Sequence, residues 1–151
     1  MRAINHALTG AIIGLSISQP VLAGSLSVLS HFACDALPHY GRNIPQNAEL
    51  RSRFFKNFLY VDAILCFLLV VLLFVLRPEH WIQAAICAFL AAAPDFLSFN
   101  RYKKIRSQKR WKPNVYSRFA GGIQWFERPI GAVVEVMWSI ATITLLLPFV
   151  T

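Results

Sequence analysis

The stretch from Phe58 to Leu76 is apolar throughout except for one charged side chain, Asp62. An α-helix needs roughly 20 such residues to cross the hydrocarbon core of a bilayer. The stretch from Ile130 to Val150 has the same character and also carries one charge, Glu135. Only 15% of the chain is charged, whereas soluble domains contain about a quarter. The sequence therefore predicts an integral membrane protein.

Three further apolar segments extend this prediction. One is long, and Pro94 and Asp95 interrupt it near its end. The other two are short, and Gln19-Pro20 between them is a turn signal, because proline disfavours helix in the residue before it. We therefore expect one all-α domain over residues 1–151, an integral membrane bundle of about five transmembrane helices. The expected spans are 5–18, 21–37, 58–76, 81–99 and 130–150.

The basic side chains predict how these spans are oriented. Most of the net charge of +8 lies in the basic loop 100–129 and in the shorter loop 38–57. Lys and Arg concentrate on the cytoplasmic side of membrane proteins. With five spans, both loops and Arg2 fall on the same side. This arrangement predicts a cytoplasmic N-terminus and a C-terminus on the outside.

Each expected span carries an ionisable side chain near its cytoplasmic end. These side chains are His6, His31, Asp35, Asp62, Asp95 and Glu135. An ionisable group inside a bilayer costs roughly 2.5–3.5 kcal/mol on insertion scales, so packing alone does not explain them. Carboxylates gathered at one depth repel one another, and a divalent cation would remove this repulsion. The pattern predicts a metal site at the cytoplasmic boundary of the membrane.

The predicted ligands are residue types that bind first-row metals. His31 and Asp35 are four residues apart, so they project from one face of a helix. Together with His6 and Asp95 they form the expected ligand set for one or two divalent ions, with zinc as the favoured metal. His6 taken alone is weak evidence, because a histidine near a span end also caps or snorkels at the interface.

Three further residues have expected roles in this site. Glu135 or Asp62 would act as general base or as a further ligand, and each could equally be a structural hydrogen-bond partner. His39 follows Pro38 at the membrane surface. It would protonate a leaving group, or else it is an ordinary interfacial histidine.

The basic segment 101–118 is what membrane topology alone requires, and its aromatic side chains also suit contact with lipid. The expected contacts with a lipid headgroup or substrate are Lys103, Lys104, Arg106 and Arg128. Each basic side chain near an anionic membrane contributes about 1 kcal/mol. We therefore expect the bilayer, anionic lipids and a lipid-like substrate as partners. The aromatic residues could also stack on single-stranded nucleic acid, but no nucleic-acid-binding motif accompanies them, so nucleic acid is not an expected partner.

Short motifs in the chain resemble those of a known family. "NHALTG", "SHFACDALPHY" and "APDF" resemble motifs of the YdjM-like membrane-bound metal-dependent hydrolases. The H-x-x-x-D spacing is also similar in type to sites of zinc-dependent phospholipases C and nucleases. The resemblance covers mainly residues 5–40 and 91–96, and it implies a divalent-metal hydrolase of the bacterial inner membrane that acts on phosphoester bonds. The H-R-G-x-x-H-S and Pro-Asp-x-Asp-His segments of longer members do not occur in this sequence.

The leading hypothesis is a membrane-embedded, metal-dependent hydrolase of a lipid or lipid-linked phosphoester. Two other classes remain open. The polar layer could form a cation or proton path, although the ionisable groups occupy one side only and no inverted repeat is visible. The metal could also be purely structural: four protein ligands favour structure, and an open position favours catalysis.

Overall fold

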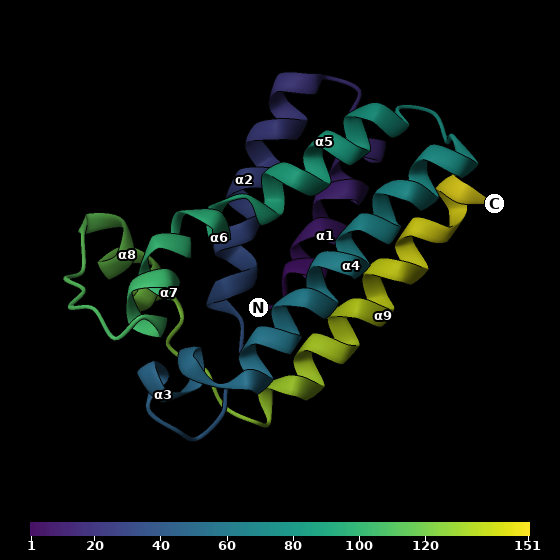
Figure 1. Cartoon of the computed structure of the whole chain (residues 1–151). Coiled ribbons are helices and arrows are strands. Elements are labelled where there is room, and N and C mark those ends of the chain that lie inside the picture. The colour runs from purple at the N-terminus through teal and green to yellow at the C-terminus, as the bar shows by residue number, and fades with distance from the viewer.

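The computed structural model describes the backbone of residues 1–151 and every side chain except that of Gln46. Within these residues the chain is helical and forms no β-strand, so the all-α prediction is confirmed. The bundle consists of α1 (Ala3–Ser16), α2 (Pro20–Ala36), α4 (Arg53–Leu76), α5 (Trp81–Ala92) and α9 (Gly131–Val150). The remaining helices are α3 (Gln46–Arg51), α6 (Pro94–Leu97), α7 (Phe99–Arg106) and α8 (Val115–Ile123). Figure 1 shows α3, α7 and α8 gathered at one end of the bundle.

Three helical stretches among the described residues are long and apolar enough to cross a membrane. They are α4, the run Trp81–Arg106 through α5, α6 and α7, and α9. They correspond to three of the expected spans. Helix α1 has 14 residues and α2 has 17, fewer than the roughly 20 that a full crossing needs. The count of five spans and the orientation of the termini therefore stay predictions.

Helix boundaries follow local sequence signals. Ser52 caps α4 by accepting a 3.0 Å hydrogen bond from Phe55 N, which satisfies one of the free N–H groups of the first turn. Arg77, in the left-handed conformation at φ 47°, ends the same helix. Pro94 begins α6, a position where its missing N–H costs nothing. The expected span 81–99 is thus divided at the proline into α5 and α6.

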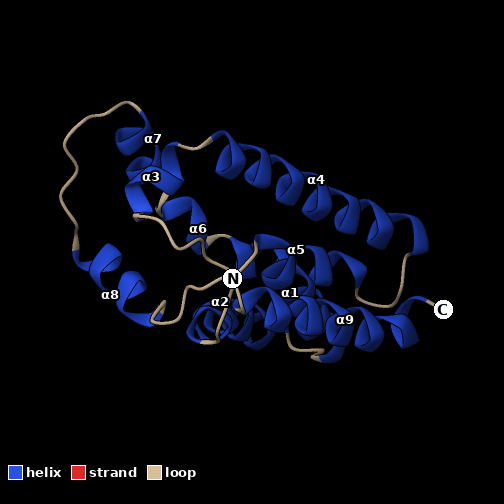
Figure 2. Cartoon of the chain, turned by 90° about the horizontal axis from the view of Figure 1, so that it is seen from below, coloured by secondary structure: helices blue, strands red, loops and turns tan.

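Helix α1 lies at the centre of the bundle and packs against α2, α4, α5 and α9. Figure 2 shows it between α4 and α9, beside α2. Its close approach to α5 requires glycine, because a Cβ at Gly10 would lie 2.3 Å from the Cys87 carbonyl oxygen. Small residues allow this approach between membrane helices. The packing holds the start of α1 against several neighbouring helices at once.

The C-terminal end of α1 is satisfied by another helix. The side-chain amide of Gln83, on α5, donates to the carbonyls of Gly14 at 3.1 Å and of Ile17 at 2.5 Å. Carbonyls at a helix end need such partners, above all where water is excluded. This contact fixes the position of α1 along the bundle.

The region expected as the basic loop 100–129 contains helical structure. It includes most of α7 and all of α8. Helix α8 begins with a capping box, in which Asn114 accepts a 2.8 Å bond from Ser117 N and the Ser117 hydroxyl accepts from Asn114 N. These reciprocal bonds stabilise a helix start, and α8 then packs against α2.

Candidate metal centre

The structure brings the four expected metal ligands together where α1, α2 and α6 meet. His6 Nε2 lies 3.2 Å from Asp35 Oδ1. His31 Nε2 lies 3.5 Å from Asp35 Oδ2 and 3.9 Å from Asp95 Oδ1. One ligand atom each from His6, His31 and Asp95 all lie within 4.8 Å of one another, so this group could hold a metal ion.

His6 provides the clearest sign that a ligand belongs at this position. The residue is 0% exposed. Its Nδ1 makes no hydrogen bond with the described residues, and its Nε2 has the 3.2 Å contact with the Asp35 carboxylate. A buried polar atom without a partner costs about 1–3 kcal/mol, and native structures contain few of them. A divalent ion bound at a ring nitrogen would satisfy one of these atoms, so the residues present fit such an ion.

A backbone contact determines which nitrogen of His31 is available. Nδ1 lies 2.8 Å from the Ala91 carbonyl oxygen. A carbonyl can only accept, so Nδ1 carries the hydrogen and Nε2 of the neutral ring keeps its lone pair. Nε2 is the atom that faces Asp35 and Asp95. Metal-binding histidines commonly donate their second N–H in this way, which fixes the ring.

The two histidine rings are aligned with each other. The rings of His6 and His31 stack with centroids 4.2 Å apart and planes 28° apart. Phe32 packs edge-on against His31 at 5.2 Å. Stacking restricts both rings to one orientation, so their nitrogens stay beside the same carboxylates.

Asp35 links the histidines to residues that the sequence analysis did not include. Oδ1 accepts from the Met1 ammonium nitrogen at 2.5 Å, and Oδ2 accepts from the Gln124 side-chain amide at 2.9 Å. The Asp35 side chain is only 6% exposed. Gln124 lies outside the expected spans and in no motif, so no sequence signal marks it as a contact of the centre.

The centre is accessible from the side on which Asp95 lies. The side chain of Asp95 is 46% exposed, whereas that of His31 is 2% exposed. The Tyr116 hydroxyl on α8 donates to the Pro94 carbonyl at 2.7 Å, which ties the turn before Asp95 to α8. The centre thus has two buried histidines and one accessible side, at Asp95.

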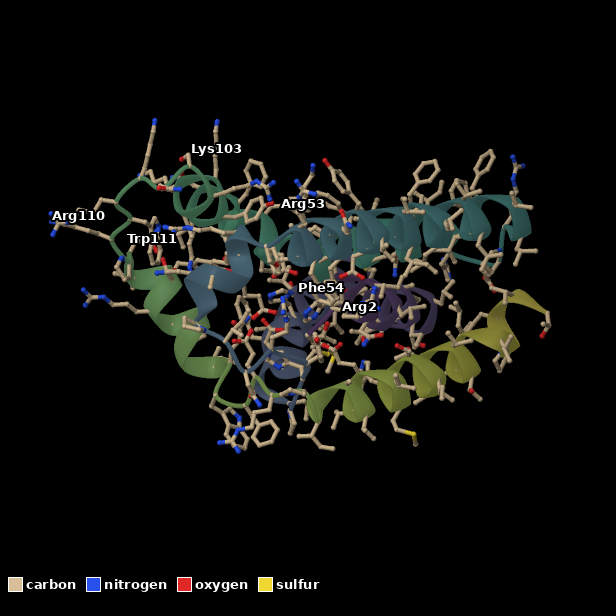
Figure 3. The ribbon with its side chains drawn as sticks, turned by 60° about the horizontal axis from the view of Figure 1, so that its bottom comes forward. Arg2, Arg53, Phe54, Lys103, Arg110 and Trp111 are labelled. Atoms are coloured by element: carbon tan, nitrogen blue, oxygen red, sulfur yellow. The ribbon has the colours of Figure 1, made fainter. Side chains whose placement is uncertain are left out.

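Asp62 and Glu135 make their contacts at the start of α1. Asp62 accepts from Arg2 Nε at 2.9 Å, Arg2 Nη2 at 2.7 Å and Ala3 N at 3.2 Å. Glu135 Oε1 accepts from Arg2 N at 3.0 Å. Figure 3 shows Arg2 between the ribbons of α4 and α9, which carry these two carboxylates. Carboxylates are favoured at a helix N-terminus. These contacts favour the structural role left open above, and the general-base role stays a prediction.

His39 lies in the connection after α2, outside the expected spans. Its Nδ1 donates to the Leu37 carbonyl at 2.8 Å. Its Nε2 is buried without a hydrogen bond among the described residues, 3.9 Å from Glu127 Oε1. Burial lowers the pKa of His39 below its ordinary value, and burial raises the pKa of Glu127. The structure thus places His39 against Glu127, and its role as a proton donor stays a prediction.

The expected headgroup contacts are exposed. They are Lys103, Lys104 and Arg106 on α7, and Arg128 before α9. Figure 3 shows Lys103 and Arg110 extending away from the bundle. Phe99, Tyr102, Lys103, Arg106 and Ser107 line a shallow cavity of about 450 Å³ on α7. Basic side chains at a membrane surface attract anionic headgroups, and those on α7 are exposed.

No family model, no curated protein and no solved structure matches this chain. The resemblance to the YdjM-like hydrolases therefore rests on the short sequence motifs alone. The function has to follow from the chemistry of the residues that the fold assembles.

Proposed function

We propose that the chain is a membrane-embedded, divalent-metal-dependent hydrolase. Its centre would lie at the cytoplasmic boundary of a bacterial inner membrane, and its substrate would be a lipid or lipid-linked phosphoester. The observation that carries the proposal is the fully buried ring of His6, whose Nδ1 lacks a hydrogen bond to the described residues and whose Nε2 faces Asp35, beside His31. Zinc is the favoured metal, because imidazole nitrogens and carboxylate oxygens are ordinary zinc ligands.

The four expected ligands would hold the metal from two sides of the centre. His6, His31 and Asp35 would hold the metal from the buried side, and Asp95 would hold it from the accessible side. When bound, the ion would activate a water molecule and polarise the phosphoester. The Ala91 carbonyl would keep His31 Nε2 directed at the metal.

The surroundings of Asp95 support a lipid substrate. Phe96 and Leu97, the next two residues, are 64% and 66% exposed. On the α2 side, Phe32 contacts both His31 and Phe119, with ring centroids 5.2 Å and 5.5 Å apart. An amphipathic molecule could lay its chains along this apolar border while its phosphate reaches the metal. The basic face of α7 would attract the same anionic headgroup.

Metal analysis of the detergent-purified protein tests the proposal. The wild type should carry a stoichiometric divalent ion, and His31→Ala and Asp35→Ala should lose it, because each removes a ligand. The protein should also hydrolyse a member of a panel of phospholipids and polyprenyl phosphates, and chelation should abolish the turnover. A wild type without metal would refute the centre.

The same experiment separates the alternative of a structural metal. A structural ion would be retained by the wild type, and its removal would unfold the protein. In that case the whole panel of phosphoesters would be left intact. The exposed carboxylate of Asp95 leaves one side of the centre accessible to a substrate, whereas four protein ligands bound at once would close the site as in structural zinc sites.

A further inference from the structure

The segment 124–128 connects α8 to α9 and runs beside residues 36–41. Trp125 Nε1 donates to the Ala36 carbonyl at 2.8 Å. Three backbone bonds continue the pairing: His39 N to Phe126 O at 3.2 Å, Arg128 N to His39 O at 3.2 Å, and Gly41 N to Arg128 O at 3.3 Å. This hydrogen bonding attaches the end of α8 to the end of α2.

Two glycines allow the segments to approach this closely. A Cβ at Gly41 would lie 2.8 Å from the Glu127 Cβ. A Cβ at Gly131 would lie 2.1 Å from the His39 carbonyl oxygen. The position of the end of α8 relative to α2 is thus determined by backbone contacts as well as by side chains.

Helix α8 and its C-cap contact one acidic ligand of the candidate metal centre directly and the residue before the other. Gln124, the C-cap of α8, donates its side-chain amide to Asp35 Oδ2 at 2.9 Å. Tyr116, near the start of α8, donates its hydroxyl to the carbonyl of Pro94, the residue before Asp95, at 2.7 Å. The histidines, by contrast, come from α1 and α2.

The amide of Gln124 restricts how the Asp35 carboxylate can rotate. The final torsion of an aspartate is broad and has no strong preference of its own. The Gln124 amide holds Oδ2 while the Met1 ammonium holds Oδ1, so the carboxylate keeps the orientation in which Oδ1 lies 3.2 Å from His6 Nε2. Hydrogen bonds of this kind to a ligating carboxylate typically affect metal affinity 10–100-fold.

We propose that α8, a helix outside the expected spans, positions both acidic ligands of the metal centre through Gln124 and Tyr116. Gln124 acts on the carboxylate of Asp35, and Tyr116 acts on the backbone that carries Asp95. This inference rests on the proposed metal centre and is independent of whether the centre hydrolyses anything.

Titration of the metal-free, detergent-purified protein with Co²⁺ tests the proposal, because visible absorption reports both the affinity and the ligand geometry of this ion. Gln124→Met keeps the side-chain length and removes the donor, so Co²⁺ should bind about 10–100-fold more weakly. Tyr116→Phe should weaken binding by about threefold to tenfold, because it acts through the backbone. Both variants should also shift the absorption bands of bound Co²⁺.

Trp125→Phe is the matched control. It removes a 2.8 Å hydrogen bond from the same segment, but that bond ends on the Ala36 carbonyl and not on a ligand. Because Ala36 follows Asp35 in the chain, this contact acts through the backbone as the Tyr116 contact does. Its loss should therefore weaken Co²⁺ binding no more than Tyr116→Phe does, and clearly less than Gln124→Met. Thermal unfolding without metal shows whether the three variants are equally folded.

Two results would overturn the inference and leave the proposed metal centre standing. One is a Gln124→Met variant that binds Co²⁺ with the affinity and spectrum of the wild type. The other is a Trp125→Phe variant that weakens binding as much as Gln124→Met, since both would then act only by loosening the segment. A wild type that binds no Co²⁺ would overturn this inference and the proposed centre together. Normal binding with no turnover on any phosphoester would refute the hydrolase proposal alone.

Discussion

Single residues of equal burial differ in whether their polar atoms have partners. Asn5 and His6 are neighbours on α1, and both are 0% exposed. Asn5 donates to the Glu135 carbonyl at 3.1 Å and accepts from the Ser139 hydroxyl at 2.6 Å. The polar atoms of the Asn5 side chain therefore have partners within the fold, whereas His6 Nδ1 has none among the described residues and Nε2 has only its 3.2 Å contact with Asp35 Oδ1.

Replacing His6 with leucine should abolish metal binding but cost the metal-free protein less than Asn5→Leu does, because Asp35 loses one contact and keeps the N-terminal ammonium and a side-chain amide as partners. Asn5→Leu is the control and should cost about 1–3 kcal/mol, because it removes both hydrogen bonds of the buried Asn5 amide, to the Glu135 carbonyl and from the Ser139 hydroxyl. Thermal unfolding after chelation, together with metal analysis, measures both effects. Equal destabilisation by the two substitutions would contradict the assignment of His6 as a ligand.

His39 should make the stability of the protein depend on pH. Burial lowers its pKa from the ordinary value of 6.5, so below pH 6.5 the unfolded chain binds a proton that the folded chain resists. The contribution of His39 is complete above pH 6.5 and is lost as the pH falls through the folded-state pKa. The raised pKa of Glu127 acts in the opposite direction.

Comparison of the wild type with His39→Gln isolates this contribution. Unfolding temperatures measured from about pH 7 to about pH 5 cover the range in which a histidine titrates. The wild type should lose more stability on acidification than the variant. Parallel curves would show that His39 is not held in its neutral form by the fold.

At the scale of elements, α1 depends on its neighbours at both ends. Its first N–H groups bond to carboxylates on α4 and α9, and its last carbonyls bond to Gln83 on α5. A helix of 14 residues is marginal by itself, since tertiary packing supplies most helical stability. This explains why acidic residues occur in the apolar helices α4 and α9 at the level where α1 begins.

Asp62→Asn tests this structural role against the catalytic one. The substitution should lower stability by about 1–3 kcal/mol, because Arg2 loses a charged partner, and it should leave the metal content unchanged. Arg2→Gln, which removes the other partner, should have a similar effect. Lost hydrolysis with unchanged stability in Asp62→Asn would instead support the general-base role.

At the scale of the whole molecule, the expected orientation places the two ends of the bundle on opposite sides of the membrane. Glu79 lies in the turn between α4 and α5, with a side chain that is 91% exposed, and Lys109 lies exposed in the basic region. A membrane-impermeant thiol reagent should label Glu79→Cys but not Lys109→Cys in intact cells. The reverse pattern would invert the orientation, and labelling of both would contradict the separation.

The sequence by itself determined the helical class and the presence of helices long and apolar enough to cross a membrane. It also predicted that histidines and carboxylates gather near one another. These are consequences of local properties, namely the length of apolar stretches and the period of a helix. The H-x-x-x-D spacing of His31 and Asp35 is local in the same sense, because residues four apart on a helix share a face.

Only the tertiary structure decided which carboxylates face the histidines and which cap α1. Asp35 and Asp95 lie beside His31, while Asp62 and Glu135 bond to Arg2. Gln124 reaches Asp35 across 89 positions of sequence. Such contacts depend on how the helices are rotated about their axes and on where α8 packs. Neither can be read from the periodicity of the sequence. The same residue types at the same depth therefore received different roles through packing alone.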